Sequence, residues 1–166
     1  MDAHGHGHGH APAREPADLN RLAFSATVHC LSGCATGEVL GMVIGTALAL
    51  SNGATVALSI ALAFFFGYSF TSWPLLRSGM ALAAVIPLAL ASDTLSIATM
   101  EVVDTLIVLV IPGAMDAGLG EALFWGSLAL ALLIAGAAAY PVNRWLLRRG
   151  RGHALVHGAH HGGHAH

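Results

Sequence analysis

Five side chains in one apolar segment belong to the types that bind transition metals. Imidazole, thiol, carboxylate and thioether groups occur together at His29, Cys30, Cys34, Glu38 and Met42. These are the groups that hold transition-metal ions in proteins. The last four follow one another at intervals of four residues, so on a helix they line one face that drifts slowly around it. The spacing predicts a metal-ligating stripe inside an apolar helix.

The spacing of Cys30 and Cys34 predicts free thiols. Helical residues four apart have Cβ atoms about 5–6 Å apart, which is longer than the roughly 3.5–4.5 Å of a disulfide. Thiolate and thioether ligands favour Cu(I), whereas a tetrahedral zinc site would use the same thiols with His29 and a carboxylate. We therefore expect a bound transition-metal ion, with copper favoured and zinc next.

A second set of polar residues lies in a later apolar stretch. Asp93, Met100 and Asp104 fall within a narrow arc of a helix, and Glu101 flanks it. A charge at the bilayer centre costs about 2.5–3.5 kcal/mol. Four carboxylates, counting Glu38, must therefore be protonated, face water or bind a cation. Each of these states indicates proton or cation handling.

Simpler interpretations exist for the same residues. Asp93 could cap a helix that starts at Thr94, and Glu101 could face a lumen without binding an ion. A single free cysteine often behaves as a small buried apolar residue. The joint occurrence of imidazole, two thiols and a carboxylate on one short stretch of helix is what favours a metal site.

The composition shows which elements must position these groups. Of 166 residues, 55% are hydrophobic and only 10% are charged, and the mean hydropathy is +0.69, whereas soluble domains carry about 25% charged residues. The apolar runs cover residues 22–50, 54–73, 80–111 and 123–147. Since about 20 apolar residues cross a bilayer, we expect an all-α, polytopic membrane helix bundle with four transmembrane segments.

The third run is too long for one simple crossing. A straight helix of that length would span about 50 Å, against a hydrocarbon core of about 30 Å. It is therefore expected to kink, extend beyond the membrane or break, with Pro87 and the Ser92–Asp93 pair as the natural places. The alternatives are a five-element bundle or a re-entrant third segment.

The arginines predict the orientation. With four spans, all of them fall on one side of the membrane, which the positive-inside rule makes cytoplasmic. We expect a multi-pass protein of the bacterial inner membrane with both termini in the cytoplasm. The seven residues concerned are Arg14, Arg21, Arg77, Arg144, Arg148, Arg149 and Arg151.

Both ends of the chain are rich in histidine. All but one of the eleven histidines lie in them, and such tracts bind Zn, Ni, Co or Cu loosely. We expect a disordered His/Gly-rich tail at residues 1–18, a transmembrane helical domain at 19–149 and a His-rich tail at 150–166.

A row of glycines runs beside the metal-ligating stripe. Glycines four residues apart let another helix approach closely, so we expect this row to pack helices together. Because four helices are few for a pore, the row also favours self-association into a homo-oligomer. Its members are Gly33, Gly37, Gly41 and Gly45.

Four longer motifs resemble a known family. The strings HCLSGCATGE, SDTLSIATMEVVDT, IPGAMDA and PVNRWLLRRGRGHA are similar to those of small bacterial membrane proteins catalogued only as a domain of unknown function. The resemblance covers roughly residues 24–157. It implies a compact helical membrane domain with a His-rich terminus, and it implies no activity.

The residues themselves predict a transition-metal transporter or channel. The ion would bind at Cys30, Cys34 and His29 and pass along the intramembrane carboxylates. The alternative is a non-transporting metal chaperone, sensor or assembly factor for a larger membrane enzyme. No nucleotide-binding loop, Ser-His-Asp arrangement or haem-attachment motif is present, so we expect no enzyme. The expected partners are the lipid bilayer, metal ions and further copies of the chain, and not nucleic acid.

Overall fold

Four long helices make up most of residues 16–149, the part of the chain that the computed structural model describes. They are α1 (Pro16–Ala47), α2 (Asn52–Arg77), α3 (Leu82–Val110) and α4 (Ala122–Arg148), with a short 3-10 helix, η1 (Ala114–Asp116), before α4. Each long helix has the length and apolar composition needed to cross a membrane. The predicted all-α bundle with four potential transmembrane helices is confirmed.

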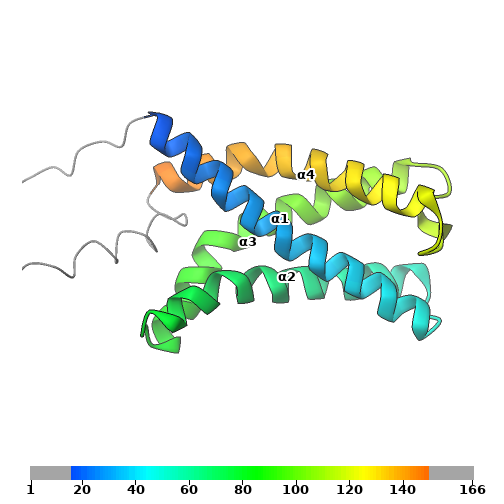
Figure 1. The fold of residues 1–166 in the computed structure, drawn as a ribbon, viewed down its shortest axis with the longest axis horizontal. Coiled ribbons are helices and arrows are strands. Elements are labelled where there is room, and N and C mark those ends of the chain that lie inside the picture. The colour runs from blue at the N-terminus through cyan, green and yellow to red at the C-terminus, as the bar shows by residue number, and fades with distance from the viewer. Residues whose placement is uncertain (1–15, 150–166) are drawn as a thin grey trace, which may run out of the picture.

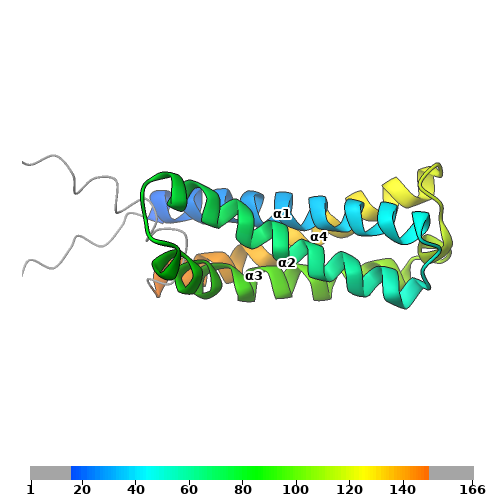
Figure 2. The same cartoon turned by 90° about the horizontal axis from the view of Figure 1, so that it is seen from below.

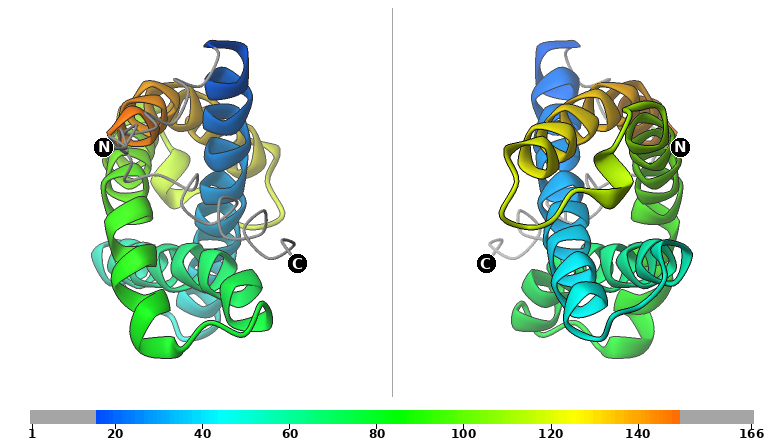
Figure 3. Two further views of the ribbon diagram at one scale, coloured as in Figure 1. Left: turned by 90° about the vertical axis from the view of Figure 1, so that its left-hand side faces the viewer. Right: turned by 90° about the vertical axis from the view of Figure 1, so that its right-hand side faces the viewer.

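The helices run alternately up and down, side by side (Figures 1 and 2). The start of α1, the end of α4 and the α2–α3 connection lie at one end of the bundle, and the other two connections lie at the opposite end (Figures 1 and 3). The tails predicted at residues 1–18 and 150–166 lie largely outside the described residues. The N-terminal boundary differs, because α1 already begins at Pro16.

The third helix does not break. α3 is continuous over 29 residues and contains both Pro87 and Asp93. The interpretation of Asp93 as a helix cap is therefore wrong. A bilayer offers no water to replace lost backbone hydrogen bonds, so a chain that must cross it keeps its helix through a proline. For the same reason α2 passes through Pro74 and ends at Arg77.

Small side chains bring α1 and α2 close together. A Cβ atom added at Gly33 would lie 2.7 Å from the Cα of Gly67, and one added at Gly37 would collide with the backbone of Ala63. The α2 residues on this face are also small, and they too recur every four residues: Thr55, Ser59, Ala63 and Gly67. The helix-packing role predicted for the glycine row is confirmed.

This packing partner belongs to the same chain. The glycine row therefore contacts α2 and is covered along its length by Thr55, Ser59, Ala63 and Gly67. It gives no support to self-association, and the homo-oligomer stays a prediction.

The bundle places large apolar side chains outside and polar ones inside. Leu133 is 68% exposed and Val110 is 77% exposed, whereas Asp93 is 1% exposed. Such an arrangement suits a lipid bilayer, where the outer face contacts acyl chains and ionisable groups face the interior of the bundle. The polar groups singled out in the sequence are thus directed into the bundle, where they can meet.

Replacing Gly37 by alanine should destabilise the bundle. The added methyl group would force α1 away from Ala63, and overpacking of this kind typically costs about 1–3 kcal/mol. Thermal unfolding of the purified protein in detergent should show a midpoint several degrees lower. Gly126→Ala is the matched control, because nothing lies within 4 Å of its added Cβ. Equal midpoints for the two variants would contradict the close α1–α2 approach.

Candidate functional site

Two rows of polar residues on α1 and α3 face each other inside the bundle. Both helices run in the same direction, so residues of increasing number meet in order along them. We call these rows the polar ladder. Its members are at most 7% exposed, and they are Cys30, Cys34 and Glu38 of α1 with Asp93, Ser96, Met100, Glu101 and Asp104 of α3. Four helical residues rise about 6 Å, which separates one level of the ladder from the next.

The level nearest the start of α1 contains Cys30. Its thiol interacts with the Ser96 hydroxyl group and lies close enough to the Asp93 carboxyl group for an electrostatic interaction. Ser92 Oγ donates a hydrogen bond of 2.9 Å to Asp93 Oδ1. A thiol, two hydroxyl groups and a carboxyl group thus meet at this level, all of them buried.

The middle level joins two sulfur atoms. Cys34 Sγ lies 3.9 Å from Met100 Sδ, and the Cys34 thiol also interacts with Glu101. Around them, small and branched apolar side chains of the other helices complete a buried cluster that includes Ala63, Ile97 and Ala135. The sulfur pair is therefore enclosed by protein on every side.

The outer level contains only carboxyl groups. Glu38 and Asp104 lie close enough to interact directly, and Glu101 is near both. Apart from a proton shared between Glu38 and Asp104, no hydrogen-bond donor of the described residues reaches either oxygen of Glu38, Oε1 of Glu101 or Oδ1 of Asp104. A buried polar group without a partner is costly, so this level requires a proton, water or a cation.

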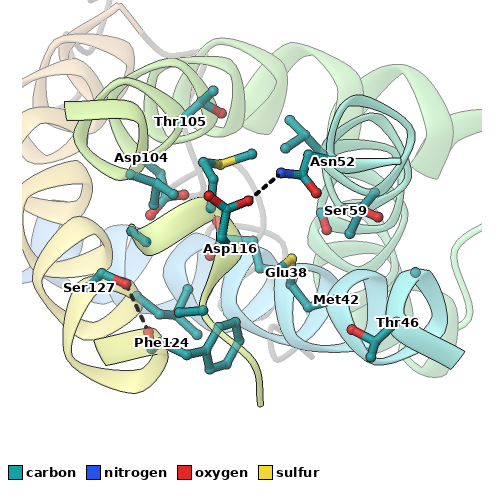
Figure 4. Close-up of a pocket in the computed structure, with 18 of the residues that line it drawn as sticks. Glu38, Met42, Thr46, Asn52, Ser59, Asp104, Thr105, Asp116, Phe124 and Ser127 are labelled. Atoms are coloured by element: carbon teal, nitrogen blue, oxygen red, sulfur yellow. Dashed lines mark hydrogen bonds between the residues drawn. The ribbon is translucent and has the colours of Figure 1, made fainter. Parts of the chain in front are cut away.

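A cavity of about 350 Å³ opens onto the outer level. Glu38, Glu101 and Asp104 line its inner part, and Met42, one turn beyond Glu38 on α1, lines it further out. Figure 4 shows the Glu38, Asp104 and Met42 side chains around this space. The cavity lies at the end of the bundle where α1 ends and α4 begins, so the ladder runs from its inner part towards the opposite end.

Most of the candidate residues are brought together, but they do not form a ready-made metal site. Both cysteines are free, as predicted, and both are buried. His29 lies partly buried with its ring 6.1 Å from that of Phe70, in an edge-on contact with α2. Among residues 16–149 there is no group of three or more His, Cys, Asp or Glu side chains with metal-binding geometry.

Two polar contacts near the ladder were not expected from the sequence. Asn52 Nδ2 donates to Asp116 Oδ1 at 3.1 Å beside the cavity, and Asn143 Nδ2 of α4 donates to Thr27 Oγ1 of α1 at 2.9 Å. Asn143 could have been recognised from the sequence as a buried polar residue, because it is an amide in an apolar run. Asp116 could not, because it lies between the apolar runs, where no helical periodicity assigns a residue to a face.

Comparison with known families gives one match. A family profile matches residues 20–152. The chain belongs to the DUF4396 family. This family is described as a domain of unknown function, which agrees with the resemblance noted from the motifs. No curated protein and no solved structure matches the chain significantly.

The polar ladder of the DUF4396 domain combines two kinds of ligand in a fixed order. A cation arriving through the cavity would first meet hard carboxylate oxygens and then soft sulfur atoms. All arginines of the described residues lie at the far end of the bundle, so no arginine side chain neutralises the outer carboxyl groups. The arrangement is suited to holding a positively charged species.

A cysteine that lines the cavity should react with a thiol reagent much faster than the buried Cys34. Thr46 is exposed and lines the cavity, whereas Cys34 is 0% exposed. In a Cys30→Ser/Cys34→Ser background, Thr46→Cys should react rapidly with a cationic methanethiosulfonate reagent. The native cysteines should react only after denaturation. Mass spectrometry of the intact protein measures both, and equal rates for Cys34 and Thr46→Cys would contradict the enclosed ladder.

Proposed function

We propose that this protein is a transition-metal transporter or channel, with copper as the favoured ion. One observation carries the proposal: buried carboxyl groups with no basic side chain of the described residues beside them line the inner part of a cavity, directly outside a buried pair of sulfur atoms. The cavity would collect the cation, and the polar ladder would carry it through the bundle between α1 and α3.

Capture of a cation would remove the main unfavourable feature of the outer level. Glu38 and Asp104 are close together and buried, and like charges in a region of low dielectric repel strongly. A cation between them would offset this repulsion and occupy the unpartnered oxygens. The absence of lysine from the chain leaves an external cation as the natural counter-charge.

The middle level supports copper over zinc. Zinc favours a tetrahedral set of Cys, His and carboxylate ligands, and no such convergence is present in residues 16–149. Cu(I) is selected by thiolate and thioether sulfur, and the Cys34 thiol lies in contact with the Met100 thioether. Cys30 adds a second thiol in the same buried cluster.

The orientation of the path follows from the arginines. All arginines of the described residues lie at the end of the bundle where α1 begins and α4 ends: Arg21, Arg77, Arg144, Arg148 and Arg149. By the positive-inside rule this end faces the cytoplasm of a bacterium whose inner membrane holds the protein. The cavity then opens on the opposite side, and the ladder leads inward from it.

A second candidate function is a membrane metal chaperone or assembly factor. One feature favours it: the cavity reaches Glu101 but not Cys34, which is fully buried. A site that receives an ion from one side and returns it to a partner on that side needs no opening at the other end. Transport requires a second conformation in which Cys30 and Asp93 become open to the cytoplasm.

Copper flux into proteoliposomes tests the proposal. The full-length chain is used with its tail histidines changed to asparagine, so that they bind no metal. We expect Cu(I) influx, reported by a trapped Cu(I)-sensitive dye, to fall at least about tenfold in Glu38→Gln and in Cys34→Ser, since loss of a metal ligand or its support costs about 10–100-fold.

Glu121→Gln is the matched control for this experiment. Glu121 is an exposed carboxylate in the α3–α4 connection and does not line the cavity, so its amide should leave the flux unchanged. Copper binding without flux would select the chaperone. Flux that is the same in wild type, Glu38→Gln and Cys34→Ser would show the proposal to be wrong.

A further inference from the structure

Two methionines line the cavity outside the carboxyl groups. Met42 lies on α1, one turn beyond Glu38 in the same row, and Met115 lies in η1, far away in the sequence. Both side chains are partly buried and both line the cavity. The pattern of α1 thus continues outward by one level, and a second thioether, from η1, lines the same cavity.

The fold fixes the segment that carries Met115. Gly113, with φ of +78°, turns the chain after α3, and Ala114 is buried with 3% exposure. On the other side of Met115, the hydrogen bond between Asn52 and Asp116 ties η1 to the start of α2. Figure 4 shows Asp116 with this bond and Met42 at the same cavity. Met115 is therefore held at the cavity between the buried Ala114 and the hydrogen-bonded Asp116.

Thioethers give this mouth a chemical preference. A thioether is an uncharged, soft and polarisable ligand, which suits Cu(I), whereas hard divalent cations prefer oxygen ligands. Carboxylates alone would accept many cations. A pair of thioethers placed before them would favour soft ions.

We infer that Met42 and Met115 form an entrance site for a soft monovalent cation, Cu(I), on the outer side of the polar ladder. The inference rests on the proposed function and deepens it, because it names the residues that would select Cu(I) at the entrance of the cavity. The ion would be bound by the two thioethers, with the Glu38 and Asp104 carboxyl groups next along the path. Zn(II) would gain nothing from this site.

Packing alone is the competing explanation, and it makes a different prediction. The cavity wall nearby already contains leucine and valine, such as Leu50 and Val56. Exchange of methionine for leucine conserves volume and apolar character and usually costs less than about 1.5 kcal/mol. Leucine would therefore fulfil a packing role at both positions but could not bind a metal ion.

Silver binding to a double variant separates the two explanations. Ag(I) serves as a probe with the charge and softness of Cu(I) but without its redox chemistry. In the full-length Cys30→Ser/Cys34→Ser chain with tail histidines changed to asparagine, where the stronger thiol ligands are absent, Met42→Leu/Met115→Leu should weaken Ag(I) binding at least about tenfold. Its Zn(II) binding should change less than twofold. Met80→Leu is the matched control, because Met80 packs against Leu75 and Val85 outside the cavity.

Methionine methyl NMR gives a second measurement that needs no variant. On titration of the wild-type protein with Ag(I), the methyl signals of Met42 and Met115 should shift, whereas that of Met80 should not. Unchanged Met42 and Met115 signals, or unchanged Ag(I) affinity in the folded double variant, would overturn the entrance site. The proposed function would then still be tested separately by the Cu(I) flux through Glu38→Gln and Cys34→Ser.

Discussion

The structure depends on one constraint: carboxyl groups must be buried among apolar helices without a basic residue to pair with. The carboxyl groups of Glu38 on α1 and Asp104 on α3 lie close together inside the bundle. Every arginine of the described residues lies at the other end. Burial of such groups is unfavourable, and ionisable residues inside a membrane domain usually mark a functional site. The small-residue packing of α1 on α2, the length of α3 and the cavity all serve to position this pair.

Much of this arrangement could be predicted because it is local. Helical periodicity placed Cys30, Cys34 and Glu38 on one face, and the glycine spacing placed a close neighbour beside it. The distance between i and i+4 positions predicted free thiols, which the structure confirms. A membrane helix also leaves few choices of secondary structure, so four helices followed from composition and length.

The remaining features depend on contacts between distant parts of the chain. The pairing of Cys34 with Met100 requires the relative height of α1 and α3, which no periodicity within one segment contains. The continuity of α3 through Asp93 reverses a local preference for capping, because a helix is the only way to satisfy the backbone in lipid. Met115 lies in the short helix η1, and only the packing of η1 in the folded chain brings it to the cavity.

The proposed path is ordered by ligand type. Thioethers at the mouth, carboxylates on the cavity floor and sulfur in the core form a series in which the ion leaves solvent before it meets the most selective ligands. Apolar packing around Cys34 and Met100 keeps water from the middle level, which strengthens the interaction of an ion with its ligands. Selectivity would then arise from the core and capture from the cavity.

X-ray absorption at the copper K-edge tests the central claim most directly. The full-length protein, with tail histidines changed to asparagine, would be loaded with one equivalent of Cu(I). The account predicts sulfur scatterers around copper, fewer of them in Cys34→Ser, and no change in Glu121→Gln. A first shell of only nitrogen and oxygen, or a sulfur shell that Cys34→Ser leaves intact, would contradict the assignment of the polar ladder as the copper path.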